Sequence, residues 1–215
     1  MDITWYGHSC FRITQRNYAT IVTDPFDAKT IGYSNLKLKA DVVTVSHDAP
    51  GHNFTDAVEA NHVLAGPGEY EIGGVFIVGE AMVDTSVENP RYNIIYVIDY
   101  DGLTVAHLGD LDHIPGQSEV DGLGQVDVAL VPVGGGGGLT ASQAAEVISL
   151  LEPSIVVPMH YKTDHTDLEL DSVERFLKEM GVSNTEDIET VDTLKLTTRA
   201  NLPEGTQIVV LDTKE

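Results

Sequence analysis

Cysteine and long hydrophobic runs are what this sequence most clearly lacks. Among its 215 residues there is one cysteine, Cys10, which excludes an internal disulfide. No stretch approaches the roughly 18 apolar residues of a membrane-spanning helix. No basic segment followed by an apolar run opens the chain, so we expect no signal peptide. These absences favour the cytoplasm. Cys10 lies in an expected strand, which indicates a small buried side chain rather than a nucleophile.

Basic residues are also scarce. The chain has 12 Lys and Arg against 34 Asp and Glu, which gives a net charge of −22. A surface of this sign repels the phosphate backbone of nucleic acids and disfavours anionic membranes. We therefore expect a small-molecule substrate or ligand as the partner, with no nucleic acid and no membrane. A homo-oligomer is left open.

The first half of the chain is rich in predicted strands. A hydrophobic fraction of 42% and this length suit a single globular domain over residues 1–215. Within about residues 1–105, one short helix is expected at 55–61. Apolar runs between turn residues predict strands at 3–6, 10–14, 18–23, 42–45, 63–65, 69–72, 75–82, 93–99 and 103–108.

Helices enter in the second half, about residues 106–215. Thr140 and Gln143 form a capping box that opens a helix closed by Pro153. An apolar stripe predicts a second helix at 167–180, which stops at Gly181. Strands are predicted at 126–133, 155–158, 194–197 and 207–211. Sheet-rich segments followed by strand–helix alternation indicate an α/β (α+β) fold with layered sheets and outer helices.

Polar residues that can bind metals follow several of these predicted strands. His47 and His52 come after the strand at 42–45, His107 and Asp110 lie at the end of 103–108, and His160 follows 155–158. Strands that end at one edge of a sheet would bring them together. Imidazoles and carboxylates suit Zn²⁺, or Mn²⁺ and Fe²⁺ less specifically, and an open coordination position would activate a water for hydrolysis. The alternative is a buried polar pocket whose imidazoles hydrogen-bond one another and Asp110.

Several segments, taken together in order and spacing, carry a family resemblance. They include Gly7-His8-Ser9-Cys10-Phe11, Val43-Thr44-Val45-Ser46-His47 and His107-Leu108-Gly109-Asp110-Leu111. The full set is 3–11, 23–26, 43–47, 107–111, 131–135 and 157–163. The chain resembles the metallo-β-lactamase superfamily up to about Asp164, and within it the sugar-lactonase-like branch of metal-dependent hydrolases. The resemblance implies a four-layer αββα sandwich with metal ions at the edge between the two central sheets.

The metal-binding motif of that family is degenerate in this chain. The family loop reads His-x-His-x-Asp-His, whereas residues 47–52 read His47-Asp48-Ala49-Pro50-Gly51-His52. A further family histidine would fall within residues 79–89, where Val83 or Asp84 stands instead. The resemblance thus implies that one metal site is lost, whereas His52, His160 and the bridging Asp110 of the other are kept. It also implies that the loop Asp orients the attacking water. Because Gly51 stands at that position, the sequence leaves open whether catalysis is retained.

At most one metal is therefore expected, on His47, His52, Asp110 and His160, with Asp48 or Asp84 as additional candidates. Zn²⁺ is the first choice, Mn²⁺ or Fe²⁺ the next, and no metal the remaining alternative. Asp110 and His8 are the candidate catalytic residues, His8 because its family position lies beside the pocket; it could equally cap a turn.

Two functions follow, and the sequence leaves open whether the protein is an enzyme. The first is a hydrolase acting on an ester, a lactone or a phosphoester. The second is a non-catalytic descendant that binds a small ligand or a partner protein in the same cleft. Retention of Asp110 and His160 favours the first, and Ala49 with Gly51 favours the second. A nucleic-acid-processing enzyme of the same superfamily is a third reading, which the net charge of −22 disfavours.

The remaining candidates are assigned structural roles. Asp24 is expected to orient a loop histidine or to cap a turn. His107 is expected to be part of the strand end, and His62 to lie on the short helix. His113 and His165 are expected at the surface. The glycine run 134–138 lacks the Lys-Ser/Thr of a phosphate loop, so it is expected to let the backbone approach the pocket closely.

Overall fold

Two β-sheets form the centre of the molecule in the computed structural model, which describes residues 1–184, 188 and 190–214. The first sheet has six strands in the order β13-β1-β2-β3-β4-β5, and the second has seven in the order β14-β11-β10-β9-β8-β7-β6. The strands of the first sheet are β1 (Asp2–Gly7), β2 (Cys10–Thr14), β3 (Ile21–Thr23), β4 (Leu38–Thr44), β5 (Val58–Leu64) and β13 (Leu194–Lys195). Those of the second are β6 (Gly68–Ile72), β7 (Val75–Val83), β8 (Tyr92–Tyr100), β9 (Leu103–His107), β10 (Val128–Pro132), β11 (Ile155–Met159) and β14 (Gln207–Ile208).

The remaining elements are short. The helices are α1 (Ala28–Ile31), α2 (Gln117–Leu123), α3 (Ala141–Leu151) and α4 (Val173–Glu179), with 3-10 turns at Thr55–Ala57 and Arg199–Asn201. Two further strands, β12 (Thr190–Val191) and β15 (Val210–Leu211), pair in parallel as a small separate sheet. Among the described residues, no helix is long and apolar enough to cross a membrane.

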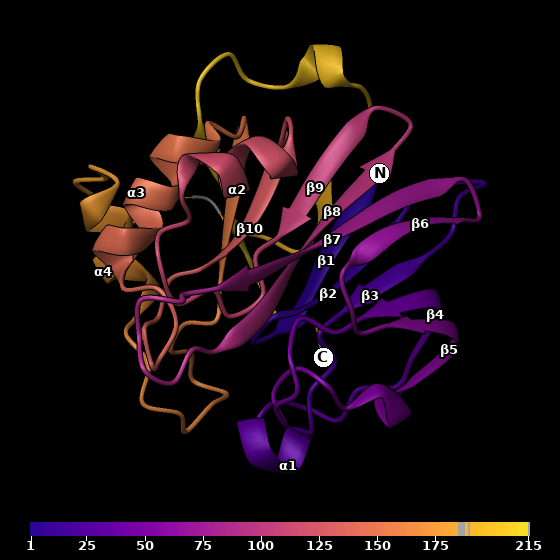
Figure 1. Ribbon diagram of the computed structural model, residues 1–215, viewed down its shortest axis with the longest axis horizontal. Coiled ribbons are helices and arrows are strands. Elements are labelled where there is room, and N and C mark those ends of the chain that lie inside the picture. Colours follow the sequence, from indigo (N-terminus) through magenta and orange to yellow (C-terminus); the bar gives the residue numbers. More distant parts are fainter. Residues whose placement is uncertain (185–187, 189, 215) are drawn as a thin grey trace.

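The period of two in the strands sorts side chains between the layers. In the first sheet, Ile21 and Val42 face the main core between the sheets, whereas their neighbours Val22 and Val43 face a second core on the outer side. There they meet Ile31 of α1. Figure 1 shows α2, α3 and α4 together beside β10, far from α1. The expected αββα sandwich of the metallo-β-lactamase type is confirmed, with a thin outer layer over the first sheet.

Some predicted elements differ from the structure. The helix expected at 55–61 is a 3-10 turn followed by β5, which pairs in parallel with β4, so His62 lies exposed on a strand. The helix expected at 167–180 begins only at Val173, because the preceding loop returns to the glycine run through the bond from Asp171 N to Gly134 O. Helix α2 was not expected, since it buries only Val120 and Leu123.

Strand direction brings the chemistry to one edge. Strands β9, β10 and β11 are mutually parallel, so the segments after them all leave the second sheet at the same edge. Strands β1, β3 and β4 likewise end together in the first sheet, because β2 is antiparallel to both β1 and β3, and β4 is parallel to β3. Backbone bonds join the two edges: His160 N donates to His8 O at 3.1 Å, and Ile94 N donates to Ser46 O at 2.9 Å.

Candidate metal centre

A cavity of about 510 Å³ opens at this shared edge. It is lined by residues from both sheets, among them His8, His47, His52, Arg91, Asp110 and His160. All four residues of the predicted metal set therefore reach one cavity, together with His8, the other candidate site residue. Arg91 was not expected there.

Three buried imidazoles form the tightest group. His8, His52 and His160 each place one ring nitrogen within 4.8 Å of the others. Their ring centroids lie 4.1 Å apart for His8 and His160, and 4.8 Å apart for His8 and His52. Burial lowers the pKa of all three histidines, so each ring is neutral at pH 7. Neutral imidazole is the form that binds a metal.

The Nδ1 atom of each of these histidines is buried and has no hydrogen-bond partner in the described part of the chain. Such orphaned buried atoms are rare and call for an explanation. A transition-metal ion is the natural partner of three neutral imidazoles, so this triad fits a metal.

The backbone is strained where it presents two of these rings. His8, in the turn between β1 and β2, has a φ of 51°, and His160, just after β11, has a φ of 53°. Non-glycine residues seldom adopt this left-handed conformation, and it clusters at functional sites. Gly134 makes room beside them, because a Cβ at that position would lie 2.3 Å from the carbonyl oxygen of His160.

Gly51 and His8 share one space. A Cβ built on Gly51 would lie 2.8 Å from His8 Nε2. His8 therefore occupies the volume into which a side chain at position 51, the Asp position of the family loop, would project. The ring of His52 is held separately, by a bond of 3.2 Å between its Nε2 and Ser9 Oγ. The structure thus gives a physical reason for the glycine at position 51.

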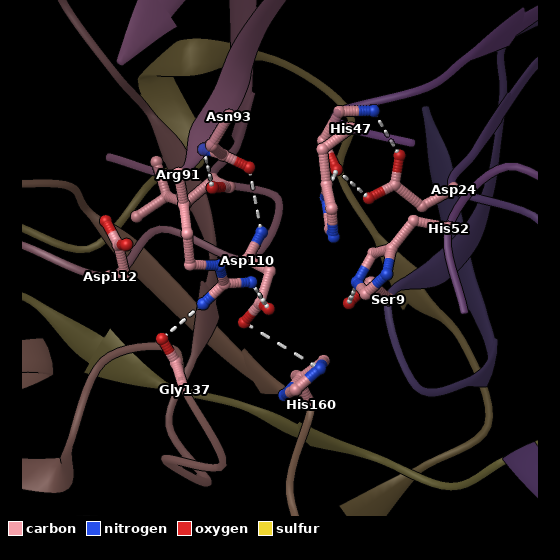
Figure 2. Close-up of polar contacts among 12 residues, drawn as sticks. Ser9, Asp24, His47, His52, Arg91, Asn93, Asp110, Asp112, Gly137 and His160 are labelled. Carbon is pink, nitrogen blue, oxygen red and sulfur yellow. Dashed lines mark hydrogen bonds and ion pairs between the residues drawn. The ribbon is translucent and has the colours of Figure 1, made fainter. Parts of the chain in front are cut away.

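Asp110 lies between His160 and Arg91, as Figure 2 shows. Its Oδ2 accepts from Arg91 Nη2 at 2.5 Å, and its Oδ1 is 3.8 Å from His160 Nε2. Oδ1 is buried and has no hydrogen bond within the described residues. Asn93 positions the backbone, because its Oδ1 accepts from Asp110 N at 3.0 Å. A Cβ on Gly138 would lie 2.2 Å from Asp110 Oδ1, so the glycine run does approach the pocket closely.

His47 stands beside the triad and is only half-buried. Its ring centroid is 4.2 Å from that of His52. Asp24 supports it indirectly: Ser46 Oγ donates to Asp24 Oδ2 at 2.5 Å and lies 3.0 Å from His47 Nδ1. Complete burial raises the pKa of Asp24 to about 8. Asp24 therefore orients a loop histidine through Ser46, one of the two roles expected for it.

The structure also places the other candidates. Within the described chain His107 uses both ring nitrogens, as expected of a structural residue: Nδ1 accepts from Gly109 N, and Nε2 donates to Ser9 O. Asp48 is exposed and bonded to Asn53, and Asp84 accepts from Ser86, so neither lines the cavity. The set of residues that would bind a metal stays a prediction, and the geometry now adds His8 to it.

Sequence reasoning missed Arg91. It lies in an irregular segment before β8 and belongs to no motif. The available signal was that basic residues are rare in this chain and that Arg91 stands just before a strand. Because that strand, β8, runs antiparallel to β9, its start lies at the edge where Asp110 lies.

Comparison with known proteins gives the same class. A family model described as a β-lactamase superfamily domain matches residues 2–160, and the chain belongs to this superfamily. More narrowly, it belongs to the UPF0173 family, whose members include metal-dependent hydrolases. A UPF0173 protein of Pyrococcus furiosus is 32% identical over 187 residues, which cover 76% of this chain and 84% of the relative. A UPF0173 metal-dependent hydrolase of Thermococcus kodakarensis is 30% identical over 194 residues, with 76% and 85% covered.

A solved structure agrees with this placement. A Thermotoga maritima protein of the metallo-β-lactamase superfamily, for which Zn-dependent hydrolase activity is proposed, is 36% identical. It superposes with a TM-score of 0.79, and 99% of each chain is covered. The expected family is therefore confirmed, whereas the substrate and the identity of the metal are not fixed by these likenesses.

Proposed function

We propose that this protein is a hydrolase that uses a single divalent metal, held by His8, His52 and His160, with Asp110 Oδ1 as the adjacent carboxylate ligand. The observation that carries the proposal is the group of three buried imidazoles with one ring nitrogen each within 4.8 Å of the others. Each has an Nδ1 without a hydrogen-bond partner among the described residues, and so has the adjacent Oδ1 of Asp110. Zn²⁺ suits this donor set best, with Mn²⁺ or Fe²⁺ as alternatives. Relatives named as metal-dependent hydrolases support the same class.

A divalent cation held by these residues would supply Lewis-acid chemistry to a carbonyl or phosphoryl group and to water. The protein residues prepare the site. Burial keeps the three imidazoles neutral. Asn93 holds the backbone of Asp110, and the absence of a side chain at Gly138 leaves room for its carboxylate. In this proposal His47, oriented by Ser46 and outside the triad, takes or returns a proton at its other ring nitrogen, Nε2.

The substrate we propose is a small ester, lactone or phosphoester. A cavity of about 510 Å³ falls within the range typical of small-molecule sites. The net charge of −22 argues against a nucleic acid or an anionic membrane as partner. A cytoplasmic location remains part of the proposal.

A ligand-binding protein without catalysis is the second candidate. It is favoured by the ion pair that Arg91 makes with Asp110, because a carboxylate already paired with a guanidinium is a weaker metal ligand. The two candidates differ in whether a metal is required.

Metal content decides between them. We would analyse purified, untagged protein by elemental analysis, alongside His8→Ala, His52→Ala, His160→Ala and, as a control, His62→Ala, which alters an exposed histidine on β5. We expect one equivalent of metal in the wild type and the control, and none in the three triad variants. A wild type that binds no Zn²⁺, Mn²⁺ or Fe²⁺ even after their addition would overturn the hydrolase proposal and leave the ligand-binding protein.

A further inference from the structure

Arg91 is unusual within the cavity. In a chain with 12 basic and 34 acidic residues, it is the one Lys or Arg among the described residues that line this cavity. It precedes β8, whose amino end lies beside the carboxyl end of its antiparallel partner β9. The fold therefore delivers its guanidinium to the edge where Asp110 stands.

The guanidinium is held in a built position. Nη2 donates to Asp110 Oδ2 at 2.5 Å, and Nη1 donates to the carbonyl oxygen of Gly137. Gly137 has a φ of 109°, and a Cβ there would lie 3.2 Å from Arg91 Nη1. Residue 137 thus favours glycine both for its backbone conformation and for the close approach of this arginine (Figure 2).

These contacts leave donors over. Arginine carries five N–H donors in a planar fork, and the bonds in the described structure use two of them. The side chain of Arg91 is 41% exposed, whereas that of Asp110 is 7% exposed. Two of the five donors are therefore committed, one to Asp110 and one to Gly137, and the side chain that carries the other three is partly exposed where it lines the cavity.

Electrostatics indicate what the accessible side would bind. The opposing charge on the cavity wall comes from Asp110, already paired with Arg91, and from Glu169, which is exposed. A planar guanidinium with spare donors is a preferred partner of carboxylate and phosphate groups.

We propose that Arg91 forms an anion-binding subsite beside the histidine triad, and that the ligand carries a carboxylate or phosphate group. Asp110 links the two parts, with Oδ2 on the guanidinium and Oδ1 towards His160. The inference rests on the proposed function for its substrate class, since it restricts the proposed substrate to molecules that also carry a carboxylate or phosphate group. The subsite itself does not require a metal.

Calorimetric titration with inorganic phosphate, and separately with acetate, tests the subsite. Wild type, Arg91→Gln, Arg91→Lys and the control Arg16→Gln would be compared, both chelator-treated and metal-loaded. Arg16 is exposed and does not line this cavity, so R16Q makes the same charge change outside the subsite. We expect R91Q to weaken binding of the preferred anion at least about tenfold without metal, R91K to weaken it less, and R16Q to match the wild type.

Equal affinities for R91Q and R16Q, or a chelator-treated wild type that binds neither anion, would overturn the subsite. If R91Q fails to fold, R91K decides, because it keeps a positive charge near Asp110 and loses the fork; affinity equal to that of R16Q overturns the proposal. Metal content separates the two hypotheses. If the protein takes up no metal but its anion binding depends on Arg91, only the hydrolase proposal is overturned. If metal content is normal but anion binding does not depend on Arg91, only the subsite proposal is overturned.

Discussion

His107 and the histidine triad of His8, His52 and His160 are all buried near the same edge of this molecule, but they differ in their hydrogen-bond partners. His107, at the end of β9, is fully buried and both of its ring nitrogens have protein partners, at 2.9 Å to Ser9 O and 3.3 Å to Gly109 N. His8, His52 and His160 are almost as buried, yet each has an Nδ1 that finds no hydrogen-bond partner in the described part of the chain. A buried polar atom costs free energy unless it is paired. His107 is therefore complete without a ligand, and the triad is not.

The largest expected effect comes from replacing one histidine of the triad and, separately, His107 by alanine. His160→Ala should lower metal affinity more than about 100-fold, because loss of even an outer-shell partner costs about 10–100-fold. His107→Ala should instead lower the free energy of unfolding by about 4 kcal/mol, because it leaves a cavity and two unpaired backbone groups. Metal titration and chemical denaturation of both variants measure this. A larger loss of metal from H107A than from H160A would contradict the division.

Acidity should reveal the buried imidazoles in the absence of metal. Burial lowers the pKa of His107 to about 4, and those of the triad are lowered too. These histidines therefore bind protons more tightly in the unfolded chain than in the folded protein. Their contribution to the free energy of unfolding is complete above pH 6.5 and is lost as the pH drops towards 4. For His107 alone, the expected loss in the free energy of unfolding is about 3 kcal/mol, at about 1.4 kcal/mol per pKa unit. Asp24, with its pKa raised to about 8, acts oppositely and loses stability as the pH rises.

Denaturation of chelator-treated protein at several pH values between 4 and 8 measures this slope. His107→Gln removes one of the titrating groups, so its curve should be flatter by about one proton below pH 6.5. A wild type and an H107Q variant with the same slope would show that burial does not lower the pKa of His107 in the folded protein.

The contrast between His107 and the triad also shows what the sequence could and could not reveal. The rule that parallel strands end together places Asp110 and His160 at one edge of the second sheet, but His47 and His52 follow a strand of the first sheet. The expectation of a single sheet edge was therefore wrong, and the family resemblance supplied the meeting of the two sheets. The distinction between His107 and the triad needed side-chain partners, which pattern does not carry. His62 was placed on a helix because seven residues of mixed pattern fit either element; pairing with β4 decided for the strand.

His8 and Arg91 mark the limit more sharply. The displacement of a position-51 side chain by the ring of His8 joins residues 43 apart in sequence, and spacing alone cannot show it. Arg91 lies in an irregular segment, whose path depends on the glycine run that it contacts. Both are cases in which tertiary contacts set the site.

A smaller effect would test whether His8 has taken the place of the family's loop aspartate. Gly51→Asp should lower metal affinity about tenfold, because its Cβ would meet His8 Nε2 at 2.8 Å and displace the ring. In a His8→Ala background the same change should raise affinity, since the space is empty and a carboxylate is supplied. Metal titration of the four proteins gives the coupling. Additive effects would mean that the two residues do not compete for one space.

The smallest expected effect concerns His47, which the sequence counted as a ligand and the geometry sets beside the triad. Ser46→Ala removes the hydroxyl between Asp24 and His47 Nδ1. We expect a loss of about 1 kcal/mol in unfolding free energy, because Asp24 Oδ2 loses a donor, and a change in metal affinity of less than about threefold. Thr4→Ala, which removes a hydroxyl outside this cavity, is the control. A loss of affinity of about tenfold or more in S46A would return His47 to the ligand set, because outer-shell effects of that size belong to groups that orient a bound ligand. The site would then use four histidines, and His107 alone would stand apart from them.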